Sequence, residues 1–112
     1  MPKSTPIEID CTAVKAKLDR GDDFVLLDCR EHDEFATAHI EGATLVPMSE
    51  LMVRRDELDS AKDKDLVVYC HHGGRSLKVA SWLRQNGFDR AVSMSGGIDR
   101  WSQTIDPAVP RY

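Results

Sequence analysis

Three observations predict an α/β fold in which five parallel strands form a sheet with helices on both faces. Short apolar runs alternate along the 112-residue chain with segments of helical periodicity. The runs that begin at Phe24 and Leu66 are continuously apolar, as expected of strands covered on both sides. Strands that alternate with helices connect as parallel units, and ligands bind beyond the carboxyl ends of such strands.

Turn and capping residues separate the elements expected in the first half of the chain. Asp10 or Thr12 can cap a helix that ends at Gly21. Pro47 ends the third strand, and Ser49 is a good N-cap for the helix after it. The expected elements are strand Ile7–Ile9, the helix up to Gly21, strand Phe24–Asp28, a short helix over Cys29–Ala36, turn His39–Ala43, strand Thr44–Val46 and helix Glu50–Leu58.

The second half contains the central strand and the longest expected helix. A polar linker, Asp59–Asp65, leads into strand Leu66–Tyr69. Ser76 can cap a helix that runs to Asn86 and ends with Gly87 at C′. A fifth strand, Ala91–Met94, precedes two glycines and a helical turn. We expect one domain over residues 1–112, with its core at about 7–103 and an irregular tail over 104–112.

The composition is that of a globular protein with reduced thiols. Apolar residues make up 41% and charged residues 30% of the chain, and no apolar run approaches the roughly 20 residues of a membrane span. The first residues lack the apolar core of a signal peptide, and the three cysteines form no even set, so we expect a cytoplasmic location without disulfides. The net charge of -4 argues against nucleic acid as a partner.

The central strand leads into a loop with the features of an anion site. The loop reads Cys70-His71-His72-Gly73-Gly74-Arg75-Ser76. Gly73 and Gly74 allow positive φ, so that several N–H groups can converge on one anion. The dipole of the following helix and the nearby Arg75 and Lys78 favour the thiolate of Cys70. The sequence therefore predicts a cysteine nucleophile that also binds an oxyanion.

Three segments resemble the signature motifs of the rhodanese-like sulfurtransferases, above all of the single-domain members. They are Asp28–Phe35 followed by His39–Ala43, the loop Cys70–Ser76, and Val92–Trp101. The resemblance implies the five-stranded rhodanese fold. Two positions depart from the family pattern: Ala38 stands where glycine is usual, and Cys29 stands where valine is usual. Alanine accommodates a positive φ poorly, so Ala38 affects the expected turn geometry.

The resemblance implies a thiosulfate sulfurtransferase that needs neither a cofactor nor a metal. Cys70 would take the outer sulfur of thiosulfate as a persulfide and pass it to cyanide, thioredoxin or a low-molecular-weight thiol. The loop N–H groups would hold the persulfide charge, and Arg75 would bind the sulfonate oxygens of the donor. The less favoured alternative for Arg75 is a surface arginine paired with a carboxylate. His71 and His72 would shape the substrate pocket or add charge when protonated.

Three further residues have expected supporting positions. Asp28 ends its strand, and its carboxylate is expected to bind backbone N–H groups of a neighbouring loop. Arg30 and Glu34 stand four apart and can pair on the solvated face of the short helix. Cys29 should lie on the same sheet edge as Cys70. It is either a buried residue or a thiol that resolves a persulfide as a disulfide, which requires Cα atoms within about 7 Å.

Three alternative functions remain open at this point. A phosphatase or arsenate reductase uses a similar thiolate and arginine, but such enzymes that resemble this fold have one residue more between them than the four found here. A zinc site could use Cys29, His32, Cys70 and either His71 or His72. A sulfur-relay module would exchange persulfide sulfur with partner proteins such as a cysteine desulfurase or a sulfur carrier.

Overall fold

The computed structural model describes residues 6–112. The prediction about a signal peptide concerns residues 1–5 and lies outside the described residues. The strands are β1 (Glu8–Ile9), β2 (Phe24–Asp28), β3 (Thr44–Leu45), β4 (Asp65–Tyr69) and β5 (Ala91–Met94). The helices are α1 (Cys11–Arg20), α2 (His32–Thr37), α3 (Leu51–Arg54), α4 (Gly74–Gln85) and α5 (Gly97–Thr104), with 3-10 turns η1 (Met48–Glu50) and η2 (Arg55–Ala61) beside α3.

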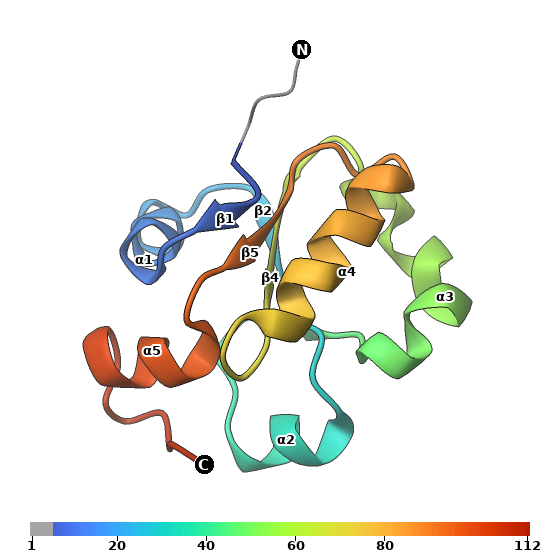
Figure 1. Cartoon of the computed structure of the whole chain (residues 1–112). Helices are drawn as coiled ribbons and strands as arrows, with labels where there is room; N and C mark the ends of the chain where they lie inside the picture. The colour runs from blue at the N-terminus through green and yellow to red at the C-terminus, as the bar shows by residue number, and fades with distance from the viewer. Residues whose placement is uncertain (1–5) are drawn as a thin grey trace.

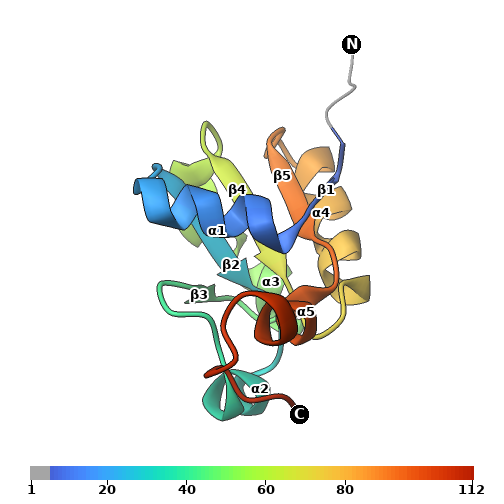
Figure 2. The same ribbon diagram turned by 90° about the vertical axis from the view of Figure 1, so that its left-hand side faces the viewer.

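The strands form one parallel sheet in the order β1-β5-β4-β2-β3. The central strand β4 has β2 on one side and β5 on the other (Figure 1). Helices α1 and α5 cover one face of the sheet, and α3 and α4 cover the opposite face (Figure 2). The predicted fold class, a five-stranded parallel sheet with helices on both faces, is confirmed.

The sheet separates two apolar cores. Alternate residues of a strand point to opposite faces, so Leu66 and Val68 of β4 pack under α3 and α4, whereas Val67 and Tyr69 pack under α1 and α5. All four side chains are fully buried. Burial on both faces explains why the strand is continuously apolar, and it fixes the position of the residue that follows it, Cys70.

The start of α4 differs from the prediction. The helix begins at Gly74, two residues before the expected cap Ser76, because Gly73 takes a φ of 111° and itself forms the N-cap. Gly74 has helical backbone geometry, so of the two loop glycines only Gly73 has a positive φ. Ser76 consequently lies buried in the first turn of the helix, with its hydroxyl directed at the loop rather than at the helix end.

Two other expected helices also differ. The N–H of Glu50 bonds the Pro47 carbonyl at 2.8 Å, which starts a 3-10 turn before Ser49 can act as a cap, and the predicted helix over 50–58 is divided between α3 and its flanking turns. The predicted helix over 29–36 begins only at His32, because Cys29 continues the strand pairing by donating its N–H to the Tyr69 carbonyl at 3.1 Å.

The chain after α5 has no further helix or strand up to Tyr112. It nevertheless packs against the body: Val109 is buried, and its carbonyl accepts a hydrogen bond of 2.6 Å from the Ser102 hydroxyl. This contact turns the tail so that the C-terminal residues lie beside α2 (Figures 1 and 2). In the part of the chain from residue 6 onward, no helix is both long and apolar enough to cross a membrane.

Candidate active site

Cys70 lies between the carboxyl end of β4 and the N-terminus of α4, and only 1% of it is exposed. Its sulfur accepts hydrogen bonds from the amide N–H groups of Gly73, at 3.1 Å, and Ser76, at 3.3 Å. The Ser76 hydroxyl oxygen lies 3.4 Å from the same sulfur. A sulfur surrounded by donors at a helix N-terminus is in a favourable position for negative charge.

These contacts lower the pKa of Cys70 to about 4. The largest contribution is a hydrogen bond from the Cys29 thiol; the hydroxyl and N–H of Ser76 and the N–H of Gly73 contribute further, whereas burial opposes them. Donors that bind the charged form stabilise it relative to the thiol. Cys70 is therefore a thiolate at neutral pH, and no separate base is needed to activate it.

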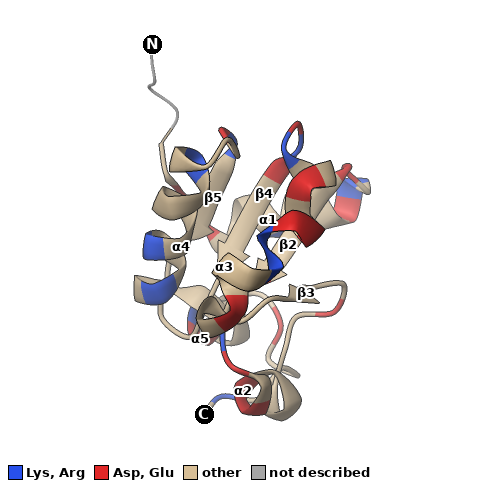
Figure 3. Cartoon of the chain, turned by 90° about the vertical axis from the view of Figure 1, so that its right-hand side faces the viewer, with Lys and Arg blue, Asp and Glu red and all other residues tan. Residues whose placement is uncertain are grey.

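The first turn of α4 offers more donors than Cys70 uses. The first N–H groups of a helix have no intrahelical acceptor, which leaves the N–H groups of Gly74 and Arg75 available beside the sulfur. Figure 3 shows Lys and Arg, and no Asp or Glu, along α4. Together these features favour a second negatively charged atom next to the Cys70 sulfur.

Helix α5 holds the loop from the other side. The N–H groups of Ile98 and Asp99, in its first turn, donate to the carbonyl oxygens of Cys70 at 2.9 Å and His71 at 3.1 Å. A side chain on Gly97 would collide with the same two carbonyl oxygens. The glycine pair that precedes Ile98 thus allows α5 to lie directly against the Cys70 loop, which keeps the loop backbone in place.

Arg75 is bound by a carboxylate from α2. Its guanidinium donates to the two carboxylate oxygens of Glu34 at 2.7 and 2.9 Å. The Tyr112 hydroxyl donates to the same carboxylate at 2.8 Å, and these hydrogen bonds, led by that of Arg75, lower the pKa of Glu34 to about 2. The predicted pair of Arg30 with Glu34 is wrong, because the fold presents Glu34 to Arg75.

Asp28 and Arg30 form a buried ion pair beneath α2. Both side chains have no exposed surface, and the guanidinium Nη2 of Arg30 lies 2.6 Å from an Asp28 carboxylate oxygen. Asp28 also accepts a hydrogen bond of 2.9 Å from the backbone N–H of Arg30. The predicted donors in a neighbouring loop are therefore wrong, because this donor lies two residues after Asp28. Arg30 Nη2 donates in turn to the Ala38 carbonyl at 2.6 Å. Ala38 has an extended backbone with φ -163°, so alanine causes no strain there.

The two histidines lie at the rim of the loop. The His71 ring stacks on His72 at a centroid distance of 3.9 Å and on Tyr112 at 4.0 Å. Burial, followed by the neighbouring His72, lowers the pKa of His71, which disfavours a positive charge at neutral pH. The side chain of His72 is largely exposed and lies 3.9 Å from the Asp99 carboxylate. Among the described hydrogen bonds, none joins either histidine to the Cys70 sulfur.

The zinc hypothesis lacks a set of ligands. Among residues 6–112 no group of three His, Cys, Asp or Glu side chains is arranged to hold a metal ion. His32, one of the proposed ligands, instead pairs at the surface with Glu50 at 2.7 Å.

Sequence reasoning missed two residues of the site. Ser93 is fully buried in β5, and its hydroxyl lies 2.7 Å from the hydroxyl of Ser76, which orients Ser76 beside the sulfur. A serine within an otherwise apolar strand is the signal that could have identified it. Tyr112 reaches the site from the irregular tail, and the sequence has no local signal for that position.

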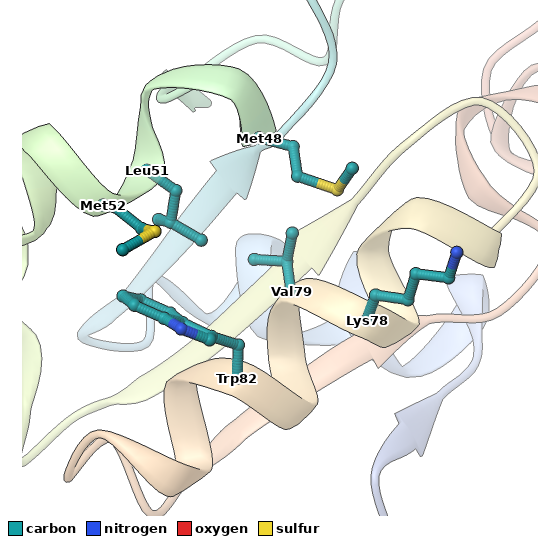
Figure 4. A pocket seen from close by; sticks show the side chains of 6 residues that line it. All are labelled: Met48, Leu51, Met52, Lys78, Val79 and Trp82. Atoms are coloured by element: carbon teal, nitrogen blue, oxygen red, sulfur yellow. The ribbon is translucent and has the colours of Figure 1, made fainter.

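An apolar groove runs between α3 and α4 beside the site (Figure 4). Its volume is about 300 Å³, and it is lined by Met48, Leu51, Met52, Lys78, Val79 and Trp82. Met52 and its neighbour Val53 are 80% and 89% exposed, unusual values for large apolar side chains.

A thiolate at a helix N-terminus, on the carboxyl edge of a parallel sheet, places the chain in the class of α/β domains built around a reactive cysteine. The family model described as Rhodanese-like domain matches residues 10–104. The chain therefore belongs to the rhodanese-like domain family of sulfurtransferases and sulfur carriers.

Relatives and solved structures agree with this membership. A protein named "Sulfurtransferase" from Allochromatium vinosum is 34% identical over 91% of this chain and 94% of its own length. "Adenylyltransferase and sulfurtransferase MOCS3-2" from Zea mays is 32% identical over 100% of this chain, which spans 24% of that longer protein. The crystal structure of a rhodanese-like domain protein from Staphylococcus aureus superposes with a TM-score of 0.76 at 30% identity, covering 94% of this chain and 97% of that chain.

Proposed function

We propose that this protein is a thiosulfate sulfurtransferase that carries a sulfane sulfur on Cys70 as a persulfide. The observation that supports this most is the Cys70 thiolate beside unused N–H donors in the first turn of α4. A persulfide extends the cysteine by one sulfur atom and carries its charge on that atom. The N–H groups of Gly74 and Arg75 are available to bind it.

The reaction would proceed in two displacements. The Cys70 thiolate attacks the outer sulfur of thiosulfate, the S–S bond of the donor breaks, and its electron pair leaves with sulfite. A thiol or cyanide then attacks the persulfide's outer sulfur and returns Cys70 to the thiolate. Arg75 would exchange its contact with Glu34 for the sulfonate oxygens of the donor, which the planar guanidinium can bind with two hydrogen bonds.

Intact mass spectrometry tests the first displacement. Immediately after a short incubation with thiosulfate, we expect a gain of one sulfur, about 32 Da, that cyanide or a thiol removes. Cys70→Ser should gain nothing, whereas Cys11→Ser should behave as wild type because Cys11 is buried in the other core. A folded wild-type protein with reduced Cys70 that gains no sulfur would rule out thiosulfate as the donor.

A second candidate, the sulfur relay between proteins, is favoured by the groove between α3 and α4. One matched relative is named for a sulfur carrier, and another combines an adenylyltransferase with a sulfurtransferase. A protein acceptor must bring its own nucleophile to the edge of the sheet, and exposed apolar side chains beside that edge suit such a contact. In this role the persulfide on Cys70 is the same, and only the donor or acceptor differs.

The two roles separate when Met52 is changed to Glu. A charge in the groove should slow sulfur transfer between Cys70 and a protein persulfide by about tenfold, because it opposes burial of an apolar partner surface. The thiosulfate-to-cyanide rate should not change, since none of the described hydrogen-bond partners of the Cys70 sulfur belongs to α3. Transfer is measured by the mass of both proteins, with Thr12→Glu, at an exposed neutral position of α1, as the control for added charge. Equal slowing of both reactions would contradict a relay surface at this groove.

A further inference from the structure

Cys29 and Cys70 are neighbours on adjacent strands. In the pairing of β2 with β4, Asp28 lies opposite Tyr69, and the N–H of Cys29 continues the ladder by donating to the Tyr69 carbonyl at 3.1 Å. The two cysteines occupy the next position in this register. Their side chains lie on the same face of the sheet, in the core under α3 and α4. Paired strands run about 4.8 Å apart, which is within the Cα separations that a disulfide spans.

The Cys29 thiol lies in the same core as the Cys70 sulfur, at the neighbouring position of the paired strand. It has no exposed surface, and within the described residues its hydrogen has two acceptors, the Tyr69 carbonyl oxygen at 3.4 Å and the Cys70 sulfur. A thiolate is the more strongly charged acceptor, and the hydrogen bond to Cys70, together with burial, raises the pKa of Cys29 well above its ordinary value. Of the two other cysteines, Cys70 shares the core of Cys29, whereas Cys11 lies in the opposite core.

We propose that Cys29 is a resolving cysteine that attacks Sγ of the Cys70 persulfide, forming a Cys29–Cys70 disulfide and releasing the terminal sulfur as hydrosulfide. This inference rests on the proposed function, since it requires the persulfide on Cys70. The protein then has a second activity besides sulfur transfer, the reduction of a stored sulfane sulfur when no external acceptor takes it.

The step balances within the chain. A bond forms between the sulfurs of Cys29 and Cys70, the S–S bond of the persulfide breaks, and its electron pair leaves with the outer sulfur. The thiol proton of Cys29 goes to that sulfur, so the product is HS⁻. The two cysteines end as a disulfide. An external dithiol reduces this disulfide to two thiols by exchange, and the dithiol is oxidised in the process.

Formation of the persulfide moves the negative charge away from Sγ of Cys70, which makes this atom open to attack by Cys29. In the resting protein the negative charge on Cys70 keeps Cys29 protonated. In the persulfide the charge moves outward by one atom, toward the N–H groups of Gly74 and Arg75, and Sγ of Cys70 becomes the atom that a thiolate can attack. Cys29 is thus inert while Cys70 is free and reacts only when Cys70 carries sulfur.

The test loads the full chain with a low-molecular-weight persulfide, glutathione persulfide, removes the excess, and follows intact mass and hydrosulfide without added thiol. We expect wild type to lose its extra sulfur, release one equivalent of hydrosulfide and end about 2 Da below the reduced mass, with Cys29 and Cys70 in one linked peptide. Cys29→Ser retains a hydrogen-bond donor to Cys70 but no sulfur, so it should keep the added sulfur and release hydrosulfide at least about tenfold more slowly.

Two further variants serve as controls. Cys11→Ser changes a buried cysteine of the opposite core, whose sulfur lies near the carbonyl oxygens of Ser95 and Gly97, and should behave as wild type. Cys29→Val replaces the thiol by an apolar side chain if the serine does not fold. A wild type that gains sulfur but forms no linked peptide overturns the resolving role alone. A wild type that neither gains sulfur nor forms the linked peptide with this donor or with thiosulfate overturns the proposed function and the resolving role together.

Discussion

At the scale of single residues, the reactivity of the site depends on donors within one shell around the Cys70 sulfur. Ser76 contributes twice, through its N–H at 3.3 Å and its hydroxyl at 3.4 Å, and Ser93 orients that hydroxyl from β5. A hydrogen bond to the thiolate lowers the pKa of Cys70, whereas burial without donors would raise it. Removing one donor should therefore shift the pKa upward while the cysteine itself is unchanged.

Ser76→Ala tests this dependence. The rate of alkylation of Cys70 by iodoacetamide should fall in wild type as the pH decreases through a pKa of about 4. In Ser76→Ala the midpoint should lie about one unit higher, because the thiolate loses the hydroxyl donor and the thiol form becomes relatively more stable. Ser81→Ala, in the same helix, should leave the midpoint where it is. An unchanged midpoint in folded Ser76→Ala would mean that the hydroxyl does not bind the thiolate.

At the scale of elements, two helices from distant parts of the chain brace the loop. Helix α5 donates two N–H groups to the loop carbonyls, and α2 supplies Glu34 to Arg75. Gly97 is the point where α5 approaches most closely, since a side chain there would collide with loop backbone. The position of the loop is thus a property of helix packing as much as of its own glycines.

Gly97→Ala should displace the loop. Gly21 is a matched control: it has a φ of 68° against 60° for Gly97, but nothing lies within 4 Å of a side chain added there. Gly21→Ala measures the cost of the backbone conformation alone, about 1 kcal/mol, and Gly97→Ala should lower the free energy of unfolding by about 2 kcal/mol more. Urea unfolding gives both values. Similar losses in the two variants would show that α5 can move aside without cost.

At the scale of the whole molecule, the buried pair of Asp28 and Arg30 joins segments that are far apart in sequence. Asp28 ends β2, while the Arg30 guanidinium also donates to the Ala38 carbonyl after α2 and, at 2.7 Å, to the hydroxyl of Tyr112 in the tail. A single side chain thereby connects the sheet edge, the helix beside the site and the end of the chain. Breaking one partner of a buried pair leaves the other charge without compensation.

Arg30→Met should lower the free energy of unfolding by about 3–5 kcal/mol, because the Asp28 carboxylate is then buried and unpaired. The double variant Asp28→Asn, Arg30→Met should recover part of this loss, since the uncompensated charge is removed. Lys15→Met breaks an exposed pair with Asp19 on α1 and should cost at most about 0.5 kcal/mol. The measurement is urea unfolding, and a loss for Arg30→Met no larger than for Lys15→Met would contradict a structural role.

Sequence patterns alone predicted the α/β class, the succession of strands and helices along the chain, a helix cap at Asp10 or Thr12, of which the structure uses Asp10, and the strand, loop and helix around Cys70. Each of these depends on patterns of a few neighbouring residues: apolar runs, glycines and caps. The hydrogen bond of 2.8 Å from the Ala13 N–H to Asp10 is such a local contact. The predicted caps at Ser49 and Ser76 were wrong. At Ser49 a 3-10 turn starts earlier, at Pro47. At Ser76 the helix starts two residues earlier, and the hydroxyl lies beside the Cys70 sulfur and the Ser93 hydroxyl.

Which distant residues meet at the site depends on tertiary packing. Glu34 reaches Arg75 across 41 positions, and Tyr112 reaches Glu34 across 78. The neighbourhood of Cys29 and Cys70 depends on the register of β2 with β4, and that of Gly97 with the loop depends on how α5 packs. Such contacts are set by the burial of apolar faces and by pairing between strands, quantities that involve the whole chain and leave no pattern in any short stretch of it.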